Sequence, residues 1–192
     1  MDLLDKILLI SGSEQALSLL SDLMKSYGCD KITTSESGSE ARRLINRTDF
    51  DIVIISTPLR DEFGQELAIT IAEKTTAGVL LICKPEISEE ISDKSSVYGI
   101  CVLPKPLNKT LFFHSIKLLQ STRARMLTVM NEYNKLQTKI EETRLISRAK
   151  CVLIQYLKLT EPQAHRYIEK QAMDTRQSKT DVARSILTTY ET

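Results

Sequence analysis

The stretch LQSTRARMLTVMNEYNKLQTKI, residues 119–140, repeats side chains of one helical face in alternating steps of three and four. The positions are Leu119, Thr122, Met126, Val129, Tyr133, Leu136 and Ile140. This spacing is typical of a narrow helical seam. Because residues 107–161 include neither Gly nor Pro, nothing in this interval obliges a helix to stop. The pattern therefore predicts one long helix from about Asn108 to Ile154.

Two interpretations of this helix follow from the pattern. It packs as an ordinary amphipathic helix on its own domain, or it pairs with the same helix of a second copy in a coiled coil. Charged residues flank the seam, as they do on the solvated surface of a coiled coil. These are Arg123, Arg125, Glu132, Lys135, Lys139, Glu141 and Glu142. We therefore expect a homodimer, with a dimer seam made of Met126, Val129, Tyr133, Leu136 and Ile140.

Before this helix, short apolar runs alternate with amphipathic stretches. The runs cover residues 6–10, 31–34, 51–56, 78–83 and 99–103. Five mostly apolar strands separated by helices predict a parallel sheet that is covered on both faces. Right-handed crossovers then favour the flavodoxin-like α/β fold with strand order 2-1-3-4-5.

Charge is divided unequally along the chain. Residues 1–120 carry 13 Lys or Arg against 17 Asp or Glu, a net charge of −4, whereas residues 121–192 carry 13 against 8, a net charge of +5. A basic C-terminal part predicts an anionic partner, with nucleic acid as the first candidate.

Neither the cysteines nor the histidines form a recognisable site. Three of the four cysteines stand in apolar runs, and we expect all four to be small buried hydrophobic residues rather than disulfides or metal ligands. The two histidines occur without an HExxH or CxxC motif, so no metal site is expected. Without a leader-type start or an apolar run of about 18 residues, the expected location is the cytoplasm.

The loops expected after the strands carry a family resemblance. The segment Asp51-Ile-Val-Ile-Ile-Ser56-Thr-Pro58-Leu-Arg-Asp-Glu-Phe-Gly64, with Lys105-Pro106 after the fifth run, resembles the receiver domain of two-component response regulators. The likeness covers residues 1–120. Folds of this kind place their working groups at the carboxyl ends of the strands.

The receiver resemblance implies a phosphorylation chemistry for which this chain lacks the residues. The family binds Mg²⁺ with two acidic residues after the first strand, accepts phosphate on an Asp at the end of the third, and has Ser or Thr after the fourth. Ser11 and Gly12, Ser56, and Cys83 stand at these positions, and only the family lysine, Lys105, is retained. Because Mg²⁺ prefers anionic oxygen ligands, we expect a pseudo-receiver without metal or cofactor.

Two side chains near the expected phosphorylation site leave alternatives open. Ser56, at the degenerate acceptor position, is either another phosphorylation site or, as we expect, a hydroxyl that ends a strand. Asp61 is either a displaced acceptor or, as we expect, a solvated turn residue.

Two helix starts divide the C-terminal stretch. Thr160 with Gln163 is a capping-box pair, and Ser178 with Asp181 marks a second start. Together with the end of the long helix they predict a small all-α unit of three helices over residues 147–192. It would follow a pseudo-receiver over residues 1–120 and a coiled-coil linker over residues 108–146.

The C-terminal stretch resembles the ANTAR domain of bacterial antitermination regulators for amidase, nitrate and ethanolamine operons. The matching motifs are Arg148-Ala-Lys-Cys-Val-Leu-Ile, Leu159-Thr-Glu-Pro-Gln-Ala-His-Arg166, Gln171-Ala-Met-Asp-Thr-Arg176 and Asp181-Val-Ala183. The resemblance implies binding to hairpins in leader mRNA, so that a competing transcription terminator does not form. It also implies two such domains, because the family's targets are paired hairpins.

The charges of this stretch agree with an RNA partner. Between Arg144 and Arg184 there are nine basic and four acidic residues. Proteins read RNA loops with cations on phosphates and with aromatic rings stacked on bases. Tyr156 and Tyr167 either provide such rings or build the small core. The expected RNA-binding residues are Arg148, Lys150, Arg166, Lys170, Arg176 and Lys179, of which Lys150 and Arg176 fall on family motifs.

No enzyme motif is present, since Ser11-Gly12-Ser13 lacks the P-loop spacing and a GxSxG elbow is absent. The expected function is transcription antitermination, controlled through a receiver-like domain by a protein or a small molecule. One alternative is a protein-interaction scaffold whose pseudo-receiver docks a signalling partner. Another is a DNA-binding regulator, although no convincing recognition-helix pattern is found.

Overall fold

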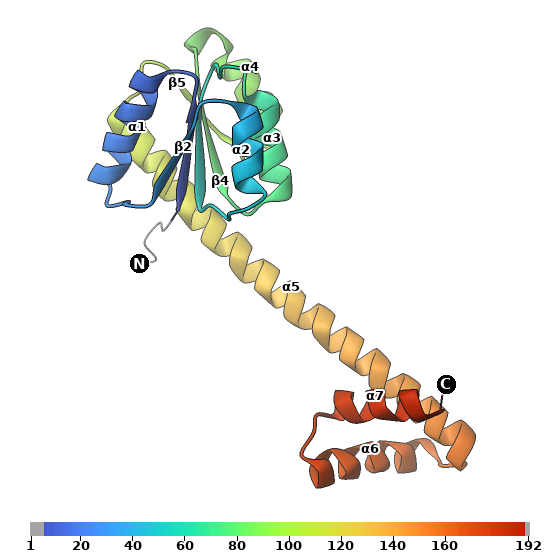
Figure 1. The fold of residues 1–192 in the computed structure, drawn as a ribbon. Helices are drawn as coiled ribbons and strands as arrows, with labels where there is room; N and C mark the ends of the chain where they lie inside the picture. The colour runs from blue at the N-terminus through green and yellow to red at the C-terminus, as the bar shows by residue number, and fades with distance from the viewer. Residues whose placement is uncertain (1–5, 191–192) are drawn as a thin grey trace. The chain divides into compact units, whose positions relative to one another are not determined.

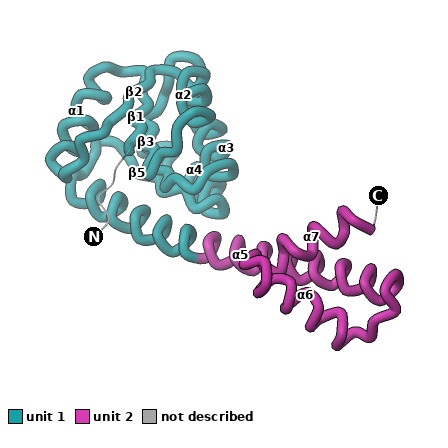
Figure 2. Tube along the Cα trace, turned by 60° about the horizontal axis from the view of Figure 1, so that its bottom comes forward, with its two compact units in different colours: residues 1–128 teal, residues 129–192 magenta. Residues whose placement is uncertain are grey.

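The computed structural model describes residues 6–190. The chain forms two compact units, one ending at Thr128 and the other beginning at Val129 (Figure 2). The first unit contains a five-stranded, all-parallel sheet in the order β2-β1-β3-β4-β5, as predicted (Figure 1). The strands are β1 (Ile7–Ser11), β2 (Ile32–Ser35), β3 (Ile52–Ser56), β4 (Gly78–Cys83) and β5 (Cys101–Pro104).

Successive side chains of each strand point to opposite faces of the sheet, and both faces are covered. The helices are α1 (Glu14–Ser26), α2 (Gly38–Ile45), α3 (Gln65–Lys74), α4 (Pro85–Ser96) and α5 (Lys109–Leu157). Ile7 and Leu9 of β1 enter one core with α1 and α5, whereas Leu8 and Ile10 enter the other with α2, α3 and α4. The doubly covered sheet explains why the strands are apolar on both sides.

Helix α5 spans 49 residues and begins after Asn108, whose side chain accepts a hydrogen bond of 3.1 Å from the Leu111 backbone N–H. Its first turns bury Phe112, Ile116 and Leu119 in the first unit. Leu119, the first position of the repeat seen in the sequence, is therefore a core residue and not part of an exposed seam. In this first part of α5, the exposed apolar residues are Leu111 and Leu118.

The second unit combines the end of α5 with α6 (Glu161–Thr175) and α7 (Lys179–Tyr190). Both predicted helix starts are confirmed. The Thr160 N–H donates to Gln163 Oε1 at 2.8 Å, and the Asp181 N–H donates to Ser178 Oγ at 3.1 Å. The buried core consists of Ala149, Val152, Leu153, Ala164, Ile168, Ala172, Val182, Ala183, Ile186 and Leu187.

The cysteines differ in burial. Cys29 and Cys83 are buried and Cys101 is partly buried, but Cys151 is exposed. The expectation of a buried residue is wrong for Cys151, because α5 turns its neighbours Val152 and Leu153 to the core at this point. In the part of the chain that the structure describes, no helix is long and apolar enough to cross a membrane.

Candidate functional sites

At the carboxyl edge of the sheet, the neighbouring strands β1 and β3 both end in serine. Ser11 and Ser56 are paired in the parallel register, and only 2% and 3% of their surfaces are exposed. The Ser11 hydroxyl accepts a hydrogen bond of 3.2 Å from the Ser13 backbone N–H. The degenerate acceptor position therefore carries a covered, uncharged hydroxyl.

The loop that follows β3 lies directly on Gly12. The Gly12 N–H donates to the Pro58 carbonyl oxygen at 3.4 Å. A Cβ added at Gly12 would lie 3.1 Å from that oxygen and from the Arg60 backbone nitrogen. Because close-packed backbone leaves no room for extra atoms, an acidic side chain at this position would require the loop to move.

Lys105, the retained receiver lysine, is held by backbone rather than by an acid. Its Nζ donates to the Thr57 carbonyl oxygen at 2.6 Å, and the Thr57 hydroxyl donates to the Ile82 carbonyl oxygen at 3.2 Å. Burial lowers the pKa of the Lys105 ammonium, and the opposing influence of Cys83 does not offset it. Among residues 6–190, no group of three or more His, Cys, Asp or Glu is placed to hold a metal ion.

Asp61, in the β3–α3 loop, is exposed, as expected for a turn residue, but it also caps α2. Its carboxylate accepts hydrogen bonds from the backbone N–H groups of Gly38 at 2.7 Å and Ser39 at 3.0 Å. The first N–H groups of a helix have no partner within the helix. These bonds, that of Gly38 first, lower the pKa of Asp61. The partners stand more than 20 residues earlier in the chain, so local sequence gave no sign of them.

Two ion pairs also join the β3–α3 loop to α2 and to the residues before it. Arg60 pairs with Glu36, and Glu62 pairs with Arg42, with 3.0 Å between Arg42 Nη2 and Glu62 Oε2. The hydrogen bond to Glu62 raises the pKa of Arg42. Asp61 and these two pairs together hold the loop that covers Gly12.

Replacing Asp61 with Asn tests the cap, because it removes the charge and keeps the shape. Since the native pKa of Asp61 is lowered, its stabilisation is present above its ordinary pKa of about 3.9 and is lost as the pH falls through the native value. We expect Asp61→Asn to lower the free energy of unfolding in urea at pH 7, by an amount that shrinks toward pH 3. Asp22→Asn, at an exposed position of α1, is the control. Equal effects of the two variants would contradict the cap.

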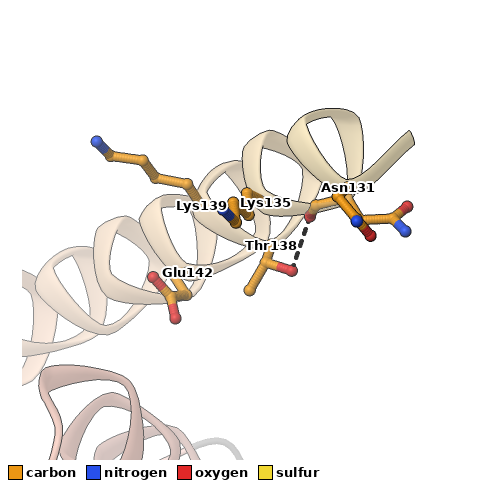
Figure 3. A pocket seen from close by; sticks show the side chains of 6 residues that line it. Asn131, Lys135, Thr138, Lys139 and Glu142 are labelled. Atoms are coloured by element: carbon orange, nitrogen blue, oxygen red, sulfur yellow. Dashed lines mark hydrogen bonds between the residues drawn. The ribbon is translucent and has the colours of Figure 1, made fainter. Parts of the chain in front are cut away.

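The middle of α5 has an apolar and a polar side. Every residue from 128 to 144 is exposed. The predicted seam residues expose between 51% and 67% of their surfaces: Met126, Val129, Tyr133, Leu136 and Ile140. Figure 3 shows part of the polar side, where the Thr138 hydroxyl donates to the Asn134 carbonyl oxygen at 3.0 Å. The shallow depression drawn there is lined by α5 alone, so it offers no enclosure for a ligand.

Some of the expected RNA-binding cations in the second unit already have partners. Lys150 Nζ lies 2.6 Å from Glu161 Oε1, and Lys179 Nζ lies 2.6 Å from Glu169 Oε1. These hydrogen bonds lower the pKa values of both glutamates. Arg148 also has an interaction partner. Lys150, the family-motif residue, is therefore a cation already balanced by its neighbour.

The other expected cations are free. Arg166, Lys170 and Arg176 are exposed and make no ion pair with any residue of the described range 6–190. Arg166 and Lys170 are one helical turn apart on α6, on the side opposite its buried residues. Met173, which is 71% exposed, follows on the same side. This outward side of α6 is the best-formed cationic face of the unit.

Two basic residues at helix ends have left-handed backbone. Lys158, after α5, has φ 56°, and Arg176, the C-cap of α6, has φ 54°. Glycine or asparagine usually takes this position, because a Cβ is strained there. A cation also complements the negative end of the helix dipole. Lys158 was not predicted as a site residue; the clue in the sequence is a basic residue where a helix end would favour Gly.

Tyr156 and Tyr167 lie at the surface of the second unit. Its buried core contains only Ala, Val, Leu and Ile. Tyr156 and Tyr167 are 54% and 38% exposed, so neither builds the core. The ring of Tyr156 lies 5.4 Å, centroid to centroid, from that of Tyr190. Tyr190 was not considered from the sequence.

Both units are similar to known proteins or protein families. The ANTAR domain family matches residues 134–187. The first unit is similar to the signal receiver domain of an HD domain-containing protein from Pseudomonas fluorescens Pf-5, with a TM-score of 0.59, 18% identity, and coverage of 67% of this chain and 95% of that chain. A receiver domain protein from Clostridium thermocellum gives a TM-score of 0.57, 19% identity, and coverage of 64% and 99%. These likenesses establish the receiver fold. Residues 134–187 thus match the ANTAR domain family, and the first unit has the fold of receiver domains.

The similarity to one curated protein extends over both units. The transcriptional regulatory protein PdtaR of Mycobacterium tuberculosis (strain CDC 1551 / Oshkosh) is 26% identical over 187 residues, which cover 96% of this chain and 90% of PdtaR. PdtaR of strain H37Rv gives the same values. The chain thus resembles a transcriptional regulator along nearly its whole length.

Proposed function

We propose that this protein is a cytoplasmic transcription antitermination regulator that binds hairpins in leader mRNA through its C-terminal unit. The ANTAR match supports this, together with the free cations Arg166 and Lys170 on the outward side of α6 and Arg176 at its C-terminal end. Such cations bind the phosphates of RNA loops. Bound protein would stabilise a hairpin whose formation excludes the competing terminator.

In this proposal the receiver-like unit answers to a binding partner and not to a phosphoryl donor. The buried Ser56 hydroxyl offers no carboxylate for an acyl phosphate. Backbone of the β3–α3 loop lies 3.1 Å from the place of a Cβ at Gly12 and leaves little room for an acid there, whereas Mg²⁺ requires oxygen ligands, preferably anionic ones. A protein or a small molecule then supplies the signal.

Incubation of the full chain with acetyl phosphate and Mg²⁺ tests this statement. We expect intact-mass measurement to show no added phosphoryl group, while a competent receiver domain treated in parallel is labelled. A stoichiometric, acid-labile adduct would overturn the proposal. An acid-stable adduct that disappears in Ser56→Ala would support phosphorylation of Ser56 instead.

We further propose that the protein is a homodimer joined along α5. The seam residues Met126, Val129, Tyr133, Leu136 and Ile140 are more than half exposed in the single chain. Burying apolar surface is the main driving force for association, and the opposite side of the helix is polar. A dimer also presents two ANTAR units, as paired hairpin targets require.

Charges at two seam positions test the dimer. An unpaired buried polar group costs on the order of a few kcal/mol, so Val129→Glu combined with Leu136→Glu is expected to be monomeric by light scattering. Asn131→Glu combined with Thr138→Glu adds the same charges at the same spacing on the polar side (Figure 3) and is expected to remain dimeric. A wild type that is monomeric at micromolar concentration, or dissociation of both double variants, would count against the seam.

A second candidate function is the protein-interaction scaffold. Val97 and Tyr98, just after α4, are 87% and 40% exposed, and a docked partner would cover such apolar groups. Hairpin RNA and duplex DNA, tested side by side, separate the candidates. A dimeric wild type that binds no RNA would favour the scaffold, and preference for duplex DNA would favour a DNA-binding regulator.

The free and paired cations are expected to differ in their effect on RNA affinity. If about four phosphates of a single-stranded loop are neutralised, log K falls with log salt at a slope of about −3. Replacing both Arg166 and Lys170 with Ala should weaken binding and flatten the slope by about 1.4. Lys150→Ala with Lys179→Ala is the matched control and should change the slope less, because glutamates already balance these cations. Equal slopes for both double variants would remove the α6 face as the binding site.

Arg176→Gly separates an RNA contact from a structural role. Gly relieves the left-handed strain, which costs about 1–2 kcal/mol for a residue with a Cβ, although it makes the unfolded chain more flexible. We therefore expect the free energy of unfolding to stay equal or rise, while RNA affinity falls by about tenfold to a hundredfold, since contacts to charged groups contribute about 1.5–3 kcal/mol. A variant that loses stability and keeps its RNA affinity would show that Arg176 serves the fold.

A further inference from the structure

Tyr156 and Tyr190 form an aromatic pair on the surface of the second unit. Tyr156 is in the last turn of α5, and Tyr190 ends α7, which returns to α5 (Figure 1). Their ring centroids are 5.4 Å apart, and the rings are tilted by 36°. Tyr190 is partly buried against the core, whereas Tyr156 is 54% exposed. Tyr190 thus supports a ring that is largely open to solvent.

The exposed ring is not explained by the packing of the unit. The buried core consists of aliphatic side chains, and more than half of the Tyr156 surface remains outside it. Within the described range 6–190, neither tyrosine hydroxyl makes a hydrogen bond that would fix a loop or helix end. A pair of rings held in place with one of them open is a surface for another flat, apolar group.

The proposed dimer leaves this ring accessible. At 3.6 residues per turn, Tyr156 lies about 160° around α5 from the seam residue Ile140. Covering the seam therefore does not cover Tyr156. The part of Tyr156 that α6 and α7 leave uncovered, 54% of its surface, therefore stays accessible in the proposed dimer.

A free cation stands beside the ring in sequence. Lys158 follows Tyr156 by two residues, is exposed, and makes no ion pair with the described residues. Its left-handed backbone would favour Gly, so the side chain is kept at a position where it is strained. A ring and a cation at one helix end suit the two parts of a nucleotide, the base and the phosphate.

We propose that Tyr156, backed by Tyr190, is a stacking site for one unpaired RNA base, with Lys158 as the cation for the neighbouring phosphate. This site rests on the proposed RNA-binding function and lies apart from the residues Arg166 and Lys170 of the outward α6 side. It would give the protein a contact with the bases of the loop, in addition to contacts with phosphates.

The experiment uses full-length wild type to select RNA from a library of hairpins with randomised loops. Each loop nucleotide of a selected RNA is then replaced by an abasic residue. We expect one abasic position to lower wild-type affinity by about tenfold to a hundredfold, the range for loss of a base–aromatic stack. Tyr156→Leu should show the same loss with intact RNA and no further loss with that abasic RNA. Tyr156→Phe should bind like wild type, and Tyr98→Leu, an exposed tyrosine of the first unit, is the control.

Lys158→Asn completes the test, because asparagine tolerates left-handed backbone without the charge. It is expected to flatten the salt slope by about 0.7 without changing which abasic position is sensitive. If Tyr156→Leu binds intact RNA like wild type, or if no abasic position is sensitive, the stacking site is wrong while the RNA-binding function stands. If selection enriches no RNA at all, both fall. Thermal melting shows whether each variant is still folded. The affinity of the wild type for each abasic RNA tests the contact without any change in the protein.

Discussion

Helix α5 contributes to one hydrophobic core in each of the two units, and both units depend on this single element. It buries three residues in the first unit and three in the second: Phe112, Ile116 and Leu119, then Ala149, Val152 and Leu153. The second unit adds only two shorter helices, and so small a unit buries too little apolar surface to be stable without α5. A helix breaker between the two sets would interrupt the helix that connects the two units, and residues 107–161 contain neither Gly nor Pro.

The sheet and the helix starts could be predicted because each depends on residues that are close together in the sequence. Runs such as that of β3 are apolar on both faces, and the caps at Thr160 and Ser178 need partners only three residues away. The contacts that decide the candidate sites are not local. Asp61 reaches the start of α2, and the Lys150–Glu161 and Lys179–Glu169 pairs join residues 11 and 10 positions apart across helix ends. These lysines add to the positive charge of the sequence, but only the fold shows that each is paired with a glutamate.

The same limit applies to apolar side chains. Leu118 and Leu119 are adjacent and chemically identical, yet one is 62% exposed and the other is 5% exposed. The sequence repeat includes Leu119 because its position fits the spacing of three and four residues. Leu119 is buried, however, because it faces the sheet. Cys151 shows the reverse case, since an apolar surrounding sequence did not make it a core residue. Periodicity identifies a helix face, but packing decides where along the helix that face is covered.

Communication between the two units has few physical routes in this chain. Residues 128–144 of α5 are all exposed, so no packed side chains or buried hydrogen-bond network runs along that segment. Coupling between sites needs an element with two discrete arrangements whose equilibrium both sites bias. A single exposed helix has no alternative packing, but two such helices do, because they can associate, separate or change register along an apolar stripe. The stripe also contains Leu111 and Leu118, which are exposed where α5 packs on the first unit. In the proposed dimer, helix pairing would therefore be the arrangement through which a signal at the first unit alters the spacing of the two C-terminal units.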